Sequence, residues 1–77
     1  MKMYGYTDIE PHKLTALKEV SLIADSAELR KLAEFLINQA EHFATGGEQE
    51  HAHFSDFVGN RKASSDVIIC NPKYFRE

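Results

Sequence analysis

The stretch DSAELRKLAEFLINQAEHFAT, residues 25–45, decides the fold because it is the one segment that reads as a long amphipathic helix. Asp25 can accept hydrogen bonds from the free N–H groups of the first turn, and Glu28 three residues later completes a capping box. Gly46 follows, and glycine enters the left-handed conformation of a helix C-cap without steric cost. We therefore expect one helix over about residues 26–45. Its core-facing stripe is expected to comprise Leu29, Leu32, Ala33, Leu36, Ala40 and Phe43.

The other apolar runs are short and have the pattern of strands. Residues 17–24 and 50–58 alternate between apolar and polar side chains, and residues 3–7 fit an edge strand. Residues 66–70, DVIIC, form a near-continuous β-branched run that is typical of a strand central in its sheet. The sequence thus predicts an α+β domain in the order β-β-α-β-β. The helix is expected to pack on a mostly antiparallel sheet of three or four strands.

The length of 77 residues predicts a single domain over residues 1–77, with residues 73–77 as a loose tail. The one cysteine, Cys70, rules out a disulfide within the chain. No apolar run approaches the roughly 20 residues that a helix needs to cross a bilayer, and the N-terminus lacks an apolar signal segment. We therefore expect a cytoplasmic protein that makes no contact with a membrane.

The distribution of charge is more informative than the net charge of −3. No lysine or arginine lies between Lys31 and Arg61, and we call residues 32–60 the acidic interval. A surface without cations disfavours nucleic acid, whose backbone needs basic residues to replace its counterions. The same surface would attract a basic protein. The residues expected to bind such a partner are Glu34, Glu41, Glu48, Glu50 and Asp56.

Two histidines form the only cluster with metal-ligating chemistry. His51 and His53 are two residues apart, so that in a strand both imidazoles project from one face. Such a pair suits zinc or another divalent transition metal, with Glu48 or Glu50 as a third ligand. Two subunits would supply four imidazoles, which defines an alternative function as a small metal-binding or metal-sensing dimer. A pair of structural surface histidines, without any cofactor, is the simpler interpretation.

Enzymatic function is not expected, because the motifs that assemble a catalytic site are missing. The chain has no G-x-S-x-G elbow, no phosphate-binding glycine loop, no C-x-x-C and no H-E-x-x-H. One helix and four short strands also leave little room for a deep pocket. A binding function is therefore favoured, and an interaction or structural domain without a more specific role is a further alternative.

The order of residues resembles the immunity protein 32 family of small bacterial proteins and its uncharacterised relatives. The stretches that carry the resemblance are LKEVSLIA (17–24), DSAELRKLAEFL (25–36), HAHFSD (51–56) and DVIICNP (66–72). The resemblance extends over about residues 3–72. It implies an α+β cytoplasmic protein that neutralises a polymorphic toxin by binding it, and it implies no catalytic residues.

Self-association is expected because the apolar residues exceed what one helix can cover. In a strand over residues 66–70, Val67 and Ile69 face one side while Ile68 and Cys70 face the other. Each large apolar side chain left in water forfeits roughly 1.5–3 kcal/mol. A homodimer formed through sheet surface or an edge strand is the expected solution, and the alternative is that the N-terminal strand or the tail folds over that face within one chain.

Overall fold

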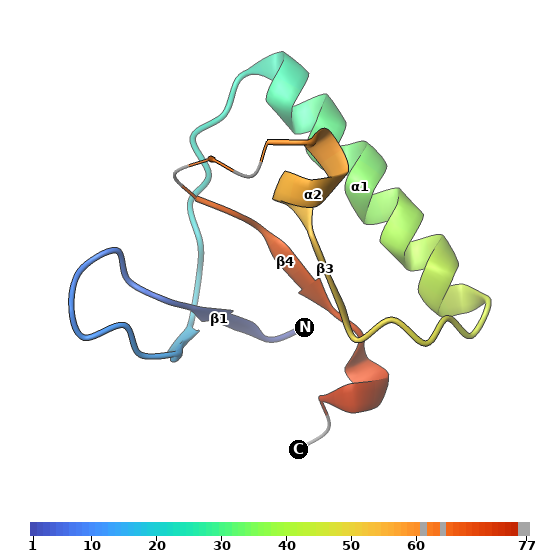
Figure 1. Ribbon diagram of the computed structural model, residues 1–77, viewed down its shortest axis with the longest axis horizontal. Coiled ribbons are helices and arrows are strands. Elements are labelled where there is room, and N and C mark those ends of the chain that lie inside the picture. Colours follow the sequence, from blue (N-terminus) through green and yellow to red (C-terminus); the bar gives the residue numbers. More distant parts are fainter. Residues whose placement is uncertain (61, 64, 76–77) are drawn as a thin grey trace.

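The computed structural model describes residues 1–60, 62–63 and 65–75 of an α+β chain. Its elements are β1 (Met3–Gly5), β2 (Thr15–Leu17), α1 (Ser26–Ala44), β3 (His51–His53), α2 (Phe54–Val58), β4 (Ile68–Cys70) and a 3-10 turn, η1 (Pro72–Tyr74). The long helix α1 lies along one side of the β3–β4 ribbon, and the β1–β2 hairpin projects from the other side (Figure 1).

The predicted helix is confirmed, together with its cap. The Asp25 carboxylate accepts from the Glu28 amide at 2.8 Å, and the Glu28 carboxylate accepts from the Asp25 amide at 3.2 Å. These two bonds are the predicted capping box, and they satisfy two donors that the first turn leaves free. The helix ends at Ala44, and Gly46 follows with a φ of 79°. Local chemistry therefore sets both ends of α1.

The predicted core stripe was correct only in part: Leu32 and Phe43 are half-buried, but the other four expected residues are exposed. Phe35 is 1% exposed and Gln39 is also buried, although neither was in the expected set. Leu29 and Leu36 belong to the expected set, but they are 48% and 41% exposed. Ala33 and Ala40 from that set are also exposed. The reason is that only a narrow face of α1 is covered: the Phe35 ring lies 5.5 Å from the rings of both Phe54 and Phe57. The half-buried residues along this face are Leu32, His42 and Phe43.

The single sheet of three or four strands was also wrong. The strands form two separate antiparallel ribbons, β1–β2 and β3–β4. Met3 pairs with Leu17 in the first ribbon, and His51 pairs with Cys70 in the second. The strand predicted over residues 17–24 was wrong: β2 covers Thr15–Leu17 and overlaps it only at Leu17, and residues 18–24 have no strand partner within the described chain.

The predicted strand over residues 50–58 ends at His53 and continues as α2. The Asp66 carboxylate accepts from the Ser55 amide at 2.8 Å in the first turn of α2, which favours a helix there. Gly59 ends α2 in the left-handed conformation with a φ of 72°. The segment also fits helical spacing, because Phe54 and Phe57 are three residues apart and both contact Phe35.

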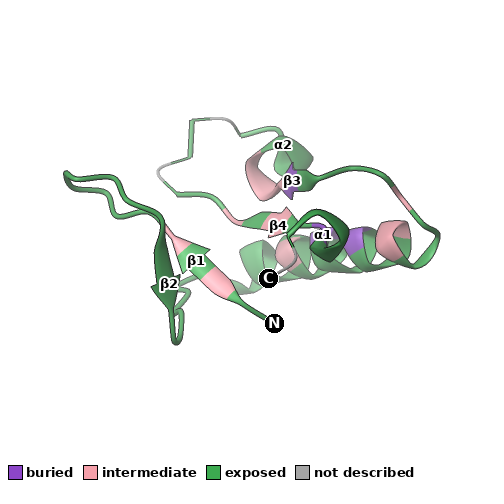
Figure 2. Cartoon of the chain, turned by 90° about the horizontal axis from the view of Figure 1, so that it is seen from below, coloured by how far each residue is buried: buried purple, intermediate pink, exposed green. Residues whose placement is uncertain are grey.

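The core is small. Phe35 and Ala52 are the buried apolar residues within the described ranges, and Gln39 and Asn71 are the buried polar ones. Figure 2 shows buried positions on α1 and β3, whereas most of the chain is exposed. The expected loose tail starts in the turn η1, which includes Lys73 and Tyr74, and its last two residues lie outside the described part of the chain. Across the described residues, no helix combines the length and the apolar character needed to cross a membrane.

Candidate protein-binding surface

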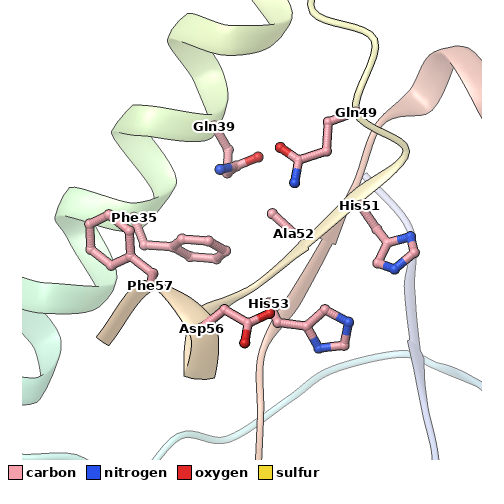
Figure 3. Close-up of a pocket in the computed structure, with 8 residues that line it drawn as sticks. All are labelled: Phe35, Gln39, Gln49, His51, Ala52, His53, Asp56 and Phe57. Carbon is pink, nitrogen blue, oxygen red and sulfur yellow. The ribbon is translucent and has the colours of Figure 1, made fainter. Parts of the chain in front are cut away.

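A hollow of about 410 Å³ opens between α1 and the β3–α2 segment. Figure 3 shows the Phe35 and Phe57 rings along one wall and the two glutamine amides facing each other at one end. The residues that line it are Phe35, Gln39, Gln49, His51, Ala52, His53, Asp56 and Phe57. A hollow with one aromatic wall and with amide, imidazole and carboxylate groups around the rest is suited to receive a polar side chain of another protein.

The two histidines of β3 lie together, as the sequence predicts. Their ring centroids are 5.3 Å apart, and both rings lie on the face of β3 opposite Ala52 (Figure 3). His53 Nδ1 lies 2.9 Å from an Asp66 carboxylate oxygen. This contact leaves Nε2 of His53 as the nitrogen that can meet a ligand. Within the described ranges, no group of three His, Cys, Asp or Glu side chains could hold a metal ion.

Asp66 organises the start of α2 and was missed by the sequence reasoning. Its carboxylate accepts from the Ser55 amide, the Ser55 hydroxyl and the Val67 amide at 2.8, 2.8 and 2.9 Å. Burial raises the pKa of the Asp66 carboxyl, but the hydrogen bonds from His53, Ser55 and Val67 together outweigh it and lower this pKa. The signal in the sequence was an aspartate preceding a strand, which is too common to be diagnostic.

Ser55, His53 and Asp66 do not form a catalytic triad, although the residue types match one. In a triad the histidine lies between the serine and the aspartate and takes the serine proton. Here the Ser55 hydroxyl donates directly to the Asp66 oxygen that also faces His53 Nδ1. The serine hydroxyl is therefore held by a carboxylate in a capping arrangement, and the cluster has a structural role.

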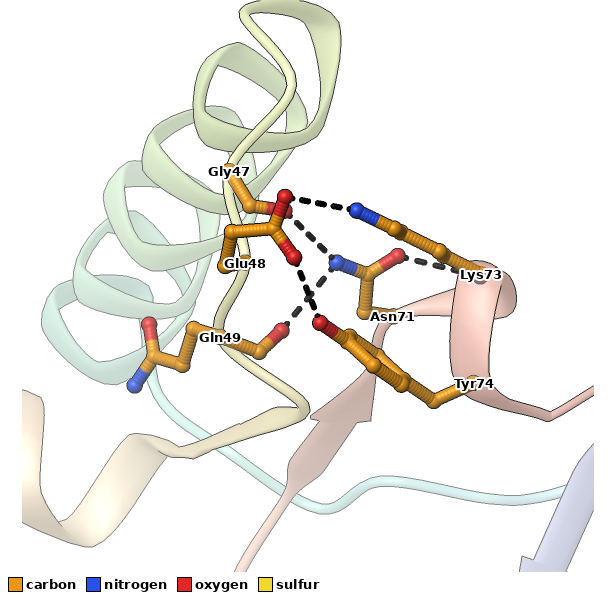
Figure 4. Close-up of polar contacts among 6 residues, drawn as sticks. All are labelled: Gly47, Glu48, Gln49, Asn71, Lys73 and Tyr74. Carbon is orange, nitrogen blue, oxygen red and sulfur yellow. Dashed lines mark hydrogen bonds and ion pairs between the residues drawn. The ribbon is translucent and has the colours of Figure 1, made fainter.

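A second polar cluster joins the C-terminal turn to the α1–β3 connection (Figure 4). Asn71 is 4% exposed, and its side-chain amide donates to the carbonyls of Gly47 and Gln49 at 3.1 Å each. Its side-chain oxygen accepts from the Lys73 amide at 3.1 Å. Asn71 therefore ties together segments more than 20 residues apart. In the sequence, Asn71 stood out only as part of the stretch DVIICNP that resembles the family.

Glu48 belongs to this same cluster rather than to the histidines. Its carboxylate accepts from Lys73 Nζ and from the Tyr74 hydroxyl, each at 2.7 Å. The hydrogen bond from Lys73, then that from Tyr74, lowers the pKa of Glu48. The same contacts raise the pKa of Lys73 and of Tyr74. The structure therefore does not bring Glu48 toward His51 and His53 as a third ligand.

The five acidic residues lie on three parts of the chain, and all are exposed. Glu34 and Glu41 are two turns apart on one side of α1, and Glu34 pairs with Lys31 at 3.3 Å. Glu48 and Glu50 lie in the α1–β3 connection, where Glu48 pairs with Lys73. Asp56 lies in α2 at the edge of the hollow. Lysines therefore already contact the carboxylates of Glu34 and Glu48.

The model of the immunity protein 32 family matches residues 19–72, more than two thirds of the chain. The chain belongs to the immunity protein 32 family. The match confirms the resemblance seen in the sequence, and the matched residues contain α1, β3, α2 and β4. No curated protein matches the chain, and no solved structure matches it. In this member of the family, the hollow and both polar clusters thus lie within or beside the matched segment.

Proposed function

We propose that this chain is a non-enzymatic immunity protein that binds a protein toxin and neutralises it. The observation that carries the proposal is the family match, because it covers the α1, β3 and α2 elements that line the hollow, together with β4. No reaction needs to be assigned, since Ser55 and His53 are both engaged with Asp66. The proposal places the protein in the cytoplasm, where it would meet a toxin before the toxin acts.

The surface proposed to meet the toxin is the acidic interval, with Glu34, Glu41, Glu48, Glu50 and Asp56. A basic toxin would be attracted over long range by these carboxylates, which raises the association rate more than the lifetime of the complex. Lys31 and Lys73 already contact Glu34 and Glu48. Glu41 and Glu50 therefore should contribute most of the attraction, and Asp56 adds a carboxylate at the edge of the hollow.

The test uses two triple variants that change the net charge equally. E41Q/E50Q/D56N removes three carboxylates from the acidic interval, and D8N/E10Q/E19Q removes three from the N-terminal part of the chain. The genes that flank this chain's gene are expressed to find a toxic product, and stopped-flow association with that product should slow about tenfold in the first variant at low salt. The second variant should associate at nearly the wild-type rate. Equal slowing in both, or no slowing in the first, would contradict the assignment of the surface.

A metal-binding function is the competing proposal, and the adjacent rings of His51 and His53 favour it. One chain supplies two imidazoles, so a second copy would be needed to complete a tetrahedral site. Zinc titration into the protein, followed by the His51 and His53 ring resonances, decides the matter. A selective shift at micromolar zinc that is lost below about pH 6 would support this alternative. Unchanged ring resonances would remove it.

A further inference from the structure

The chain exposes much more surface than a folded monomer of its mass. Its accessible surface is 6786 Å², whereas folded monomers of 8.8 kDa expose about 4,800 Å². The excess is about 2,000 Å². Obligate homodimers bury about 2,000–5,000 Å² in total, so a symmetric dimer that buried this excess on each copy would lie within their range.

Exposed apolar residues of the segment 18–24 lie on the side of the molecule where β4 has a free edge. Every residue from 6 to 31 is exposed, and Ile23 is 102% exposed. Residues 18–24 run on the side of β4 that faces away from β3 (Figure 1). Val20 and Leu22 in this segment are more than half exposed, and Ile68 in β4 is 47% exposed.

The free edge of β4 offers backbone groups for a further strand. The Phe54 amide donates to the Val67 carbonyl at 2.8 Å, and the Asn71 amide donates to the Glu50 carbonyl at 2.7 Å. Because hydrogen-bonded pairs alternate along an antiparallel ribbon, the pairing of Ala52 with Ile69 is also of this kind. The N–H and C=O groups of Ile68 and Cys70 therefore point outward, away from β3.

The sequence of β4 is unusual for an edge. Natural edge strands are protected by a lysine, a proline, a bulge or a covering segment. Ile68–Cys70 carries no charge and no proline, and the surrounding β-branched run is typical of a central strand. In one chain, β4 thus occupies an edge position although its sequence is typical of a central strand. Pairing with a second copy would place β4 in the centre of a sheet.

We propose that two copies of this chain pair through β4 about a two-fold axis, in a continuous four-stranded antiparallel sheet of order β3–β4–β4–β3. One register pairs all the outward N–H and C=O groups of Ile68 and Cys70 with those of the second copy. In this register Ile68 lies opposite Cys70 of the partner subunit, and Cys70 lies opposite Ile68 of the partner subunit. Residues 18–24 of each copy lie on the side where the copies meet and are covered there. The pairing does not depend on the proposed toxin binding.

A second copy fits this edge better than a toxin does. Antiparallel pairing of identical strands is self-complementary under two-fold symmetry. The residues Ile68, Ile69 and Cys70 are uncharged, whereas the surface proposed for a basic toxin is acidic. In the dimer, the two β3 strands are three strand spacings apart, about 14 Å. The histidine pairs of two copies therefore could not share one metal ion in this arrangement.

The first test combines sedimentation equilibrium with amide hydrogen exchange on the full chain. From 1 to 100 μM protein, the mass should rise toward twice that of one chain, and the amides of Ile68 and Cys70 should gain protection in parallel. The Ile69 amide bonds within the ribbon and serves as the internal reference. A monomer at all concentrations overturns the proposal. A monomer with protected Ile68 and Cys70 amides also overturns it, since the chain would then cover its own edge.

The second test uses Ile68→Lys, with Ile37→Lys as the matched control. Both replace an exposed isoleucine by lysine, and Ile37, 61% exposed, lies on the face of α1 away from Phe35. Ile68→Lys should shift the equilibrium to the monomer, because lysine on an edge strand opposes pairing. Ile37→Lys should leave the dimer intact. If Ile37→Lys becomes monomeric while Ile68→Lys stays dimeric, the β4 interface is refuted. It is also refuted if Ile68→Lys stays dimeric and the Ile68 and Cys70 amides of the wild-type dimer still exchange rapidly.

Discussion

Replacing Asn71 by alanine tests the role of the buried polar cluster beside η1. The side chain of Asn71 is nearly inaccessible and makes three hydrogen bonds, to the carbonyls of Gly47 and Gln49 and from the amide of Lys73. In Asn71→Ala, the Gly47 and Gln49 carbonyls and the Lys73 amide lose their hydrogen bonds to this side chain. Each buried group left unsatisfied costs about 1–3 kcal/mol. Because water can replace the side chain at the groups near the surface, we expect Asn71→Ala to lower the free energy of unfolding by about 2–4 kcal/mol in total.

The measurement is urea unfolding followed by circular dichroism at 222 nm, at one fixed protein concentration because association would also affect stability. Asn38→Ala is the matched control, since Asn38 is exposed on α1 and alanine is the better helix former. Asn71→Asp adds a second comparison: it retains the acceptor for Lys73 but places a carboxylate against two carbonyls. It should therefore be destabilised at pH 7 and recover partly below about pH 4 as the carboxyl becomes protonated. Asn71→Ala within 0.5 kcal/mol of the wild type would refute the reasoning.

Two further predictions concern the ionised groups. Asp66 has a lowered pKa in the folded chain, so its carboxylate stabilises the fold above about pH 4 and this contribution is lost as the pH falls through the folded-state pKa. Urea unfolding at pH 7 should therefore show a lower free energy of unfolding for Asp66→Asn than for wild type, by about 0.5–2 kcal/mol for the lost hydrogen bonds at the start of α2. This difference in free energy should become smaller at pH 2.5, and a difference that does not change with pH would contradict the reasoning. Glu48 raises the pKa of Tyr74, so Glu48→Gln should lower the pH at which the Tyr74 ring resonances titrate, and an unchanged midpoint would show that their hydrogen bond does not persist in solution.

The helix could be predicted because local chemistry determines it. Asp25 and Glu28 cap its start, and Gly46 follows its end, so both limits depend on residues within a few positions. The buried face could not be predicted as well. The apolar positions of α1 extend almost around the helix, and the position of the three-ring contact with Phe54 and Phe57 decided which face is covered.

The strands were less predictable because they depend on partners distant in the sequence. The alternation in residues 50–58 fits a strand, yet Asp66 favours a helical turn at Ser55 from 11 residues away. The histidine pair followed directly from the two-residue period of a strand. The contacts of Glu48 with Lys73 and Tyr74 could not be foreseen, since they require the fold to bring η1 beside the α1–β3 connection.

The most direct test of the central claim is to identify a toxic product among the genes that flank this chain's gene and to titrate it with this chain, with the activity of the toxic product as the measurement. We expect activity to fall linearly and to vanish at a fixed stoichiometric ratio, with both proteins recovered chemically intact, because an immunity protein of this type acts by binding. Full toxin activity in the presence of an excess of folded chain would contradict the account. Loss of toxin activity through covalent change of the toxin at substoichiometric amounts of the chain would contradict it equally, since the chain would then act as an enzyme.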